Sequence, residues 1–162
     1  MFEITPVTND VMLAEARGLI REHLVAHSTQ HDAAGIEAIL ARLPAPYLPA
    51  GALWVGWMDG AAAGSAAIYH ANSHTAELKR MYVRPAFRGR GIARALAAHA
   101  IAEATARGYE RMRLGTLTTM IAAQTLYASL GFVPIPAYRS IEFGDTLFYE
   151  LVLPARAAGN TR

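Results

Sequence analysis

Six basic side chains gather in one short stretch of the chain, around a turn that contains glycine. They are Lys79, Arg80, Arg84, Arg88, Arg90 and Arg94. No acidic residue lies among them. A charge run most often forms a solvated face of a protein. Here Gly89 and Gly91 come just before a helical pattern, and a helix N-terminus attracts anions through its unpaired N–H groups and its dipole. The combination favours a site for a phosphate or a pyrophosphate.

Three known phosphate-binding patterns can be compared with this turn. A dinucleotide-binding fingerprint requires glycine or alanine where Arg94 stands, and it belongs near the start of a βαβ unit. A Walker A loop requires Gly-Lys-Ser/Thr, which the segment lacks. The pattern Arg/Gln-x-x-Gly-x-Gly/Ala matches Arg88–Ala93 at every defined position. The third pattern is therefore the one that this sequence supports.

A strand must lead into this turn and a helix must follow it, and the flanking residues predict both. Thr75–Val83 is expected to be a strand that ends before Pro85, because proline cannot donate to a sheet ladder. Residues 91–106 repeat apolar side chains with helical spacing, and Arg107 and Gly108 are typical of a helix end.

The rest of the chain alternates strand and helix patterns around this pair. Strands are expected at Phe2–Val7, Ala52–Met58, Ala63–His70, Arg111–Leu117, from Phe132 onward, and at Thr146–Leu153. Helices are expected from about Asp10 to His27, at Asp32–Leu43 and at Met120–Leu130. Pro44, Pro46 and Pro49 predict an extended loop between the second helix and the second strand. The order β-α-α-β-β-β-α-β-α-β-β indicates a mixed α/β domain.

Length and composition limit the class of protein. A chain of 162 residues with 53% hydrophobic and 17% charged residues fits one globular domain, and no apolar run is long enough to span a membrane. Cysteine is absent, which excludes disulfides, thiolate nucleophiles and Cys-ligated zinc. Without a pattern for a secretory signal, we expect a cytoplasmic protein with one domain at 1–153 and a flexible tail at 154–162.

Four segments resemble the GCN5-related N-acetyltransferase (GNAT) superfamily. Glu77–Pro85 resembles the fourth strand of the family, and Arg88–Ala93 resembles its pyrophosphate loop for acetyl-CoA. Gly108–Leu114 resembles the fifth strand with its lead-in, and Ala123–Phe132 resembles the signature A-x-x-LY-x-x-LGF. The resemblance covers most of the chain. It implies an α/β (α+β) fold with a mostly antiparallel sheet of about six to seven strands and about four flanking helices, splayed between the fourth and fifth strands.

The resemblance implies direct transfer of an acetyl group from acetyl-CoA, as co-substrate, to a primary amine. The backbone of Met81, Tyr82 and Val83 would contact the pantetheine and the thioester. The pyrophosphate would be held by backbone N–H groups of Arg88, Gly89, Arg90, Gly91, Ile92 and Ala93. Arg84, Arg90 and Arg94 are the candidates for the 3′-phosphate. The resemblance implies no metal.

Two side chains match catalytic positions of the family. Tyr127 matches the tyrosine that serves as general acid toward the departing sulfur, although a tyrosine on an apolar helix face is otherwise a core residue. Glu77 matches a glutamate that some members use as general base, directly or through water. The alternative for Glu77 is a solvent-facing strand residue paired with an arginine. Met120 stands where the family often has an asparagine that touches the coenzyme amide, so one polar contact is lost.

Several aromatic residues and histidines lie outside these motifs. His23, His27 and His31 recur every four residues, but no carboxylate pattern supports a metal, and we expect them to line a substrate or to be solvated. Tyr47 and Tyr138 are candidates to border the acceptor pocket, since loops carry specificity.

The sequence leaves the acceptor open between a small-molecule amine and an amine of a peptide or protein. A second hypothesis is a non-catalytic acyl-CoA sensor on the same scaffold, which Met120 favours and Tyr127 and Glu77 oppose. A nucleic-acid binder is disfavoured, because a net charge of +2 gives a small electrostatic footprint. We therefore expect neither nucleic acid nor membrane as partner, and the resemblance allows a homodimer.

Overall fold

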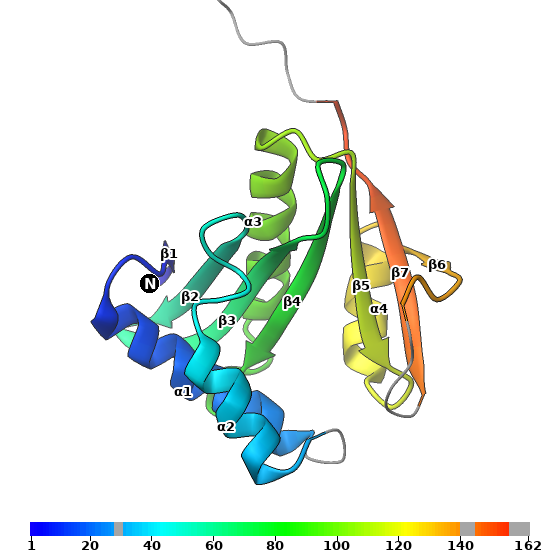
Figure 1. The fold of residues 1–162 in the computed structure, drawn as a ribbon. Helices are drawn as coiled ribbons and strands as arrows, with labels where there is room; N and C mark the ends of the chain where they lie inside the picture. Colours follow the sequence, from blue (N-terminus) through cyan, green and yellow to red (C-terminus); the bar gives the residue numbers. More distant parts are fainter. Residues whose placement is uncertain (28–30, 140–144, 156–162) are drawn as a thin grey trace, which may run out of the picture.

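A seven-stranded sheet between two pairs of helices forms the body of the computed structural model, which describes residues 1–27, 31–139 and 145–155 (Figure 1). The strands are β1 (Phe2–Pro6), β2 (Ala52–Met58), β3 (Ala61–His70), β4 (Thr75–Val83), β5 (Arg111–Leu117), β6 (Val133–Ile135) and β7 (Thr146–Val152). The helices are α1 (Asp10–Ala26), α2 (Ala33–Arg42), α3 (Ile92–Ala106) and α4 (Ile121–Ser129). Every predicted element is present, and a 3₁₀ turn at Pro85–Phe87 is added. The expected tail lies mostly outside the described residues.

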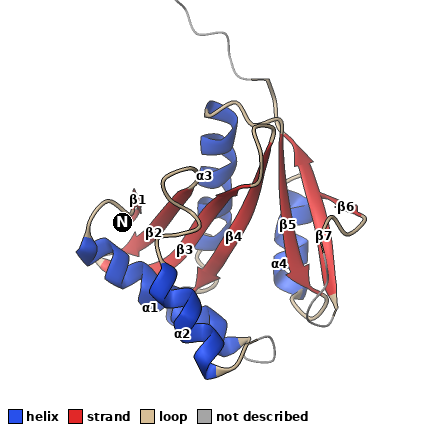
Figure 2. Cartoon of the chain, in the orientation of Figure 1, coloured by secondary structure: helices blue, strands red, loops and turns tan. Residues whose placement is uncertain are grey.

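The helices cover opposite faces of the sheet, with α1 and α2 on one side and α3 and α4 on the other (Figure 2). The core accordingly has two parts: Leu19 and Ile20 of α1 pack with Val55 of β2 on the first face, and Leu96 of α3 packs with Ile68 of β3 on the second. Polar side chains start the first two helices, since Asn9 accepts from the N–H of Met12 and Asp32 accepts from that of Gly35. None of the described helices is long and apolar enough to cross a membrane.

The strand order is β1-β2-β3-β4-β5-β7-β6, and every neighbouring pair is antiparallel except β4 and β5. These two strands are parallel and pair only over Thr75–Glu77 and Arg111–Arg113. Beyond Glu77 the two strands separate, as Figure 1 shows. The mixed fold and the expected splay between the fourth and fifth strands are thereby confirmed.

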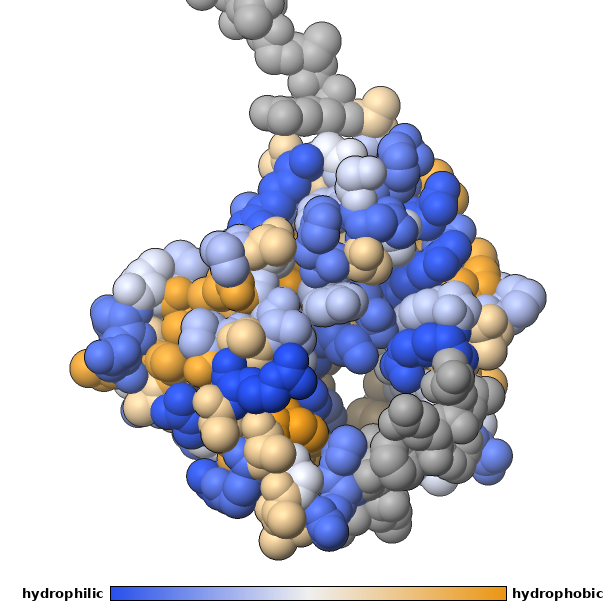
Figure 3. Space-filling model, in the orientation of Figure 1, coloured by the Kyte–Doolittle hydropathy of each residue, from blue (hydrophilic) through white to orange (hydrophobic). Residues whose placement is uncertain are grey.

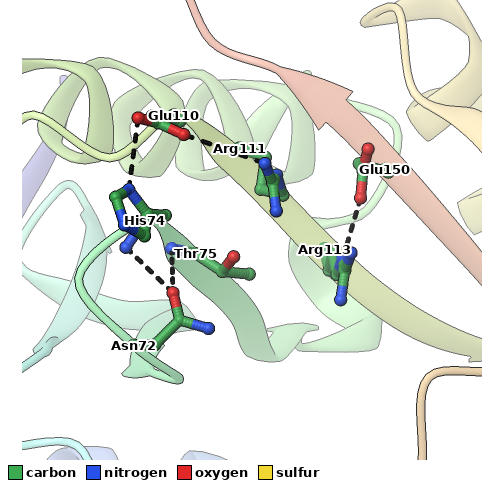
Figure 4. Close-up of polar contacts among 7 residues, drawn as sticks. All are labelled: Asn72, His74, Thr75, Glu110, Arg111, Arg113 and Glu150. Atoms are coloured by element: carbon green, nitrogen blue, oxygen red, sulfur yellow. Dashed lines mark hydrogen bonds and ion pairs between the residues drawn. The ribbon is translucent and has the colours of Figure 1, made fainter.

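Polar contacts hold the closed end of the splay together (Figure 4). The Asn72 side-chain oxygen accepts from the backbone N–H groups of His74 and Thr75, both at 2.9 Å, which shapes the turn into β4. The His74 ring lies 3.1 Å from a carboxylate oxygen of Glu110, and the Glu110 N–H donates to the His74 carbonyl at 2.8 Å. These contacts tie the start of β4 to the residues that lead into β5.

The segment with three prolines is not the extended loop that its sequence predicts. It winds into successive turns, in which the Pro44 carbonyl accepts from the N–H groups of Tyr47 and Leu48. The Tyr47 side chain is only 3% exposed, so its burial outweighs the local preference of the prolines. This compact segment places the Tyr47 hydroxyl beside Arg80 of β4, and the Arg80 Nε donates to that hydroxyl at 2.7 Å.

Gly51 allows the turn segment to lie against β3. A Cβ atom at this residue would lie 1.9 Å from the Ile68 carbonyl oxygen and 2.7 Å from that of Tyr47. We therefore predict that Gly51→Ala lowers the free energy of unfolding by at least about 2 kcal/mol, because backbone atoms must move to make room. Urea unfolding measures this loss.

The matched control is Gly18→Ala in α1, where an added Cβ would meet only Arg84 Nη2 at 3.8 Å. Alanine suits a helix interior better than glycine, so this variant should gain about 0.5–1 kcal/mol. Equal stability of the two variants would contradict the role assigned to Gly51.

Candidate active site

A cleft of about 290 Å³ lies where β4 and β5 separate. Its lining comes from both strands and from elements on both faces of the sheet: Leu78–Met81, Leu114–Leu117, His23, His27, His31, Tyr127 and Arg139, with Leu24, Met120 and Thr146. Figure 3 shows an opening through the molecule between the two halves of the sheet, bordered in part by hydrophilic residues. The resemblance implied this splay, and the structure places Tyr127, Met81 and Lys79 around it.

A bulge in β4 shapes one wall of the cleft. Ser65 of β3 pairs with Tyr82 but Ala67 pairs with Lys79, so an extra residue of β4 is accommodated between them. Arg80 has a φ of +55°, in the left-handed region that a non-glycine residue rarely adopts, and its carbonyl accepts from Ser65 Oγ at 2.8 Å.

The bulge turns two consecutive side chains to the same face of the sheet. Lys79 lies on the face of Glu77, since their charged groups are 3.2 Å apart, and Arg80 contacts Tyr47 of the α1/α2 core. Leu78 and Met81 pack into the core under α3. In a regular strand, Lys79 and Arg80 would point to opposite faces.

The edge of β4 that faces the cleft carries backbone groups outside the ladder to β5. Pairing of the described residues of the two strands stops at Glu77, so residues 78–83 have no partner in β5, and Leu78–Met81 line the cleft. Met81, Tyr82 and Val83, which the resemblance assigns to pantetheine, belong to this edge. Exposed N–H and C=O groups of a strand can bind an extended ligand as an added strand would.

The glycine turn lies at the N-terminus of α3, as predicted. Gly89 and Gly91 have φ values of +79° and +76°, and an added Cβ at either residue would meet no atom within 4 Å. Gly91 caps α3 without a side-chain hydrogen bond, which leaves the first N–H groups of the helix available. The turn can therefore accept an anion close to its backbone.

The arginines around the turn differ in their partners. Arg84 is held by Glu22 at 3.0 Å and by the Ala62 carbonyl at 2.8 Å. Arg94 donates to Ser129 Oγ at 2.7 Å. Arg90 lies 5.9 Å from the Phe87 ring centroid, and it makes no hydrogen bond or ion pair with the described residues. Of the three candidates for the 3′-phosphate, Arg90 is thus the one whose guanidinium is least engaged by the protein.

Tyr127 lines the cleft from the α3/α4 side. Its side chain is 7% exposed and packs edge-on against Phe132, with ring centroids 5.7 Å apart. Burial raises the pKa of Tyr127 to about 12, so its hydroxyl keeps its proton at neutral pH. A protonated hydroxyl at the wall of the cleft can donate a hydrogen bond or a proton to a group inside it.

Glu77 lies on the opposite face and is 5% exposed, so the solvent-facing alternative is wrong for this residue. Its Oε1 accepts from the Tyr138 hydroxyl at 3.0 Å and lies 3.2 Å from Lys79 Nζ and 3.5 Å from Arg139 Nε. The arginine pairing that this alternative included is present through Arg139, whereas Tyr138 contacts Glu77 and is not among the described residues that line the cleft. Sequence patterns did not reveal Lys79 and Arg139 as partners of Glu77. Arg139 lies far from Glu77 in the sequence, in the chain between β6 and β7.

His23 of α1 lies against the ring of Tyr82, with centroids 5.5 Å apart and planes inclined by 14°. Its Nδ1 is buried and has no hydrogen-bond partner among the described residues. Burial, together with His27 and Arg80 nearby, lowers the pKa of His23 to about 4, so the ring is neutral at pH 7. Across the described ranges, no group of His, Cys, Asp and Glu is arranged to hold a metal ion.

Met120 occupies the cleft lining at the start of α4, where the family pattern has asparagine. Its sulfur accepts from Thr116 Oγ1 at 3.8 Å. The neighbouring polar group is Gln124, whose Nε2 donates to the carbonyls of Leu117 and Thr118 at 3.0 and 2.9 Å. Gln124 thus stabilises the turn into α4, while Met120 adds apolar surface to the cleft.

Comparisons with known proteins agree with this geometry. The acetyltransferase (GNAT) family profile matches residues 18–132. N-acetylaspartate synthetase from Homo sapiens is 42% identical over 85 residues, which make up 52% of this chain and 28% of that protein. An acetyltransferase from Streptococcus agalactiae 2603 has a TM-score of 0.77 at 21% identity and is matched over 94% of this chain and 98% of its own. The putative acetyltransferase yncA from Salmonella typhimurium, solved with its cofactor acetyl-CoA, has a TM-score of 0.69 at 24% identity, with 99% of both chains matched.

The chain belongs to the acetyltransferase (GNAT) family, because the family profile covers more than half of it, including both motifs. This confirms the resemblance seen in the sequence. The solved structures share its fold. The chain spans only 28% of the length of the human relative, so the activity of that whole protein is a separate question.

The neutral state of His23 makes stability depend on pH. Its pKa of about 4 in the folded protein lies below the ordinary value of 6.5, so the unfolded chain binds a proton more readily. This contribution to stability is fully present above pH 6.5 and is lost as the pH falls toward 4. We predict that His23→Phe, which keeps an aromatic ring on Tyr82, removes about 2 kcal/mol of the stability difference between pH 7 and pH 5.

Urea unfolding of the wild type and the variant at both pH values measures this difference. The comparison cancels the titration of carboxylates that both proteins share. A variant with the same pH dependence as the wild type would contradict a neutral His23.

Proposed function

We propose that the protein is an acetyl-CoA-dependent N-acetyltransferase that moves the acetyl group directly to a primary amine of a small molecule or peptide. One observation carries the proposal: the open edge of β4 leads to a glycine turn at the start of α3, and the Tyr127 hydroxyl lies on the same cleft. We also propose a cytoplasmic location, on the basis of a chain without cysteine.

In this proposal the coenzyme lies along β4. Backbone groups of Met81, Tyr82 and Val83 bind the pantetheine arm as an added strand. The pyrophosphate is bound by the N–H groups of Arg88–Ala93, where the two glycines leave space. Arg90 is the candidate for the 3′-phosphate, and Arg94 supports the turn through Ser129.

The residues on the two faces of the sheet take different parts in the reaction. An alkylammonium has a pKa of about 10, so the acceptor must lose a proton before it attacks. Glu77, on the α1/α2 face, accepts that proton directly or through water. A backbone N–H of β4 near Val83 stabilises the oxyanion that develops. The new C–N bond forms as the C–S bond breaks, and Tyr127, on the other face, donates its proton to the departing sulfur.

Tyr127→Phe tests the assignment of the general acid. We predict that kcat falls by about 10²–10⁴-fold, the range typical of a lost acid–base group. Binding of acetyl-CoA should persist, because only a hydroxyl is removed. Thiol release from acetyl-CoA with an amine measures kcat, and the absence of cysteine keeps this assay free of protein thiols. Tyr69→Phe, at a tyrosine that is 36% exposed outside the cleft lining, is the matched control.

Acetyl-CoA binding and thiol release, measured together on the wild type, separate an enzyme from an acyl-CoA sensor. Acetyl-CoA at about 100 times its Kd should stabilise either protein by about 2.7 kcal/mol, which a thermal unfolding experiment detects. A sensor would be stabilised without thiol release in the wild type. Catalysis in the wild type that Tyr127→Phe leaves intact would instead disprove the role of Tyr127.

Arg90→Ala tests the placement of the coenzyme. Loss of a hydrogen bond to a charged group is worth about 1.5–3 kcal/mol, so the Kd for acetyl-CoA should rise by about 10–100-fold. Calorimetric titration measures the two constants. Arg42→Ala removes an exposed arginine at the end of α2 and should leave the Kd unchanged. An unchanged Kd in Arg90→Ala would place the 3′-phosphate elsewhere.

A further inference from the structure

We propose that the acceptor amine carries carboxylate groups, and that amino dicarboxylates such as acidic amino acids are its best-matched class. This inference rests on the proposed function and adds the chemistry of the acceptor to it. The observation behind it is a cluster of cations, Lys79, Arg80 and Arg139, in the lining of the cleft.

These cations lie on the α1/α2 face, away from the proposed general acid. The bulge at Arg80 places its side chain beside that of Lys79, and Arg139 approaches the same face through Glu77. Tyr127 reaches the cleft from the core under α3. A molecule that enters from the α1/α2 face therefore meets the cations before it meets the thioester.

The positive charge of this cluster is only partly compensated by the protein. Glu77 is shared by Lys79 and Arg139, and the described partners of Arg80 are the hydroxyl and the ring of Tyr47. No aspartate or glutamate belongs to the described lining of the cleft. Three cations facing one carboxylate leave an excess of two positive charges, which two carboxylates of a ligand would balance.

The surroundings of Lys79 also favour an anionic ligand. Burial lowers the pKa of Lys79, and Arg139 and Arg80 add to this effect, while Glu77 opposes it. A second anion beside Lys79 would stabilise its charged form.

The phosphates of the coenzyme do not account for these cations. The glycine turn begins after β4 ends at Val83, four residues beyond Lys79, or about 13 Å along a strand. The turn has its own arginines and opens at the N-terminus of α3, on the other face of the sheet. Lys79, Arg80 and Arg139 therefore remain for the acceptor. A polyamine would meet repulsion from them.

The test compares acceptors of the same shape but different charge. We expect kcat/KM for L-aspartate or L-glutamate to exceed that for L-asparagine or L-glutamine by at least about tenfold, and spermidine to be poorer still. Arg80→Gln and Arg139→Gln should each lower kcat/KM for the acidic acceptor by about 10–100-fold, in line with a lost charged contact. The Kd for acetyl-CoA should not change in either variant. Arg42→Gln is the control for removal of an arginine charge elsewhere.

A binding measurement keeps the inference testable without turnover. Succinate has two carboxylates and no amine, and we expect it to raise the melting temperature of the protein saturated with CoA, but not that of Arg80→Gln. Equal stabilisation of wild type and Arg80→Gln, or faster turnover of neutral or cationic amines than of acidic ones, would overturn the acidic-acceptor inference while the proposed function stands. Absence of acetyl-CoA binding would overturn both.

Discussion

The site depends on one constraint: β4 and β5 can share hydrogen bonds over only three residue pairs. Backbone N–H and C=O groups form hydrogen bonds, so the edge of β4 beyond Glu77 can pair with water or with another extended chain that lies beside it. Three larger features border the gap between β4 and β5. The contacts around His74 and Glu110 close one end, α3 starts at the other, and the core under α3 contains residues from both halves of the sheet.

Different functional groups reach the gap from the two faces of the sheet. The α3/α4 face offers a buried hydroxyl that keeps its proton, and the α1/α2 face offers a carboxylate surrounded by cations. An irregularity of a single residue, the left-handed Arg80, adds a third cation to the latter face, beside Lys79 and Arg139. A strained backbone is expected where surrounding contacts hold it, and here Ser65 and Tyr47 bind the carbonyl and the guanidinium of Arg80.

Sequence patterns predicted what depends on neighbouring residues, and missed what depends on distant ones. The strands from Ala52 to Val83, the glycine turn and α3 follow from alternation, turn residues and helix ends, so their predicted bounds nearly coincide with the structure. The pairing of Glu77 with Arg139 joins residues far apart in the chain, and the face of Arg80 depends on a bulge. The prolines misled because burial of Tyr47, a tertiary effect, overrode their local preference.

The short junction between β4 and β5 has a consequence for cooperativity. Sheet hydrogen bonds run without interruption from β1 to β4 and again through β5, β7 and β6, but only a few join the two blocks. A block with few shared hydrogen bonds can detach at a lower free energy than the whole domain needs to unfold. We therefore expect amide protons of β7 and β6 to exchange through a sub-global opening that leaves those of β2 and β3 protected, and a ligand that bridges the gap to slow that exchange.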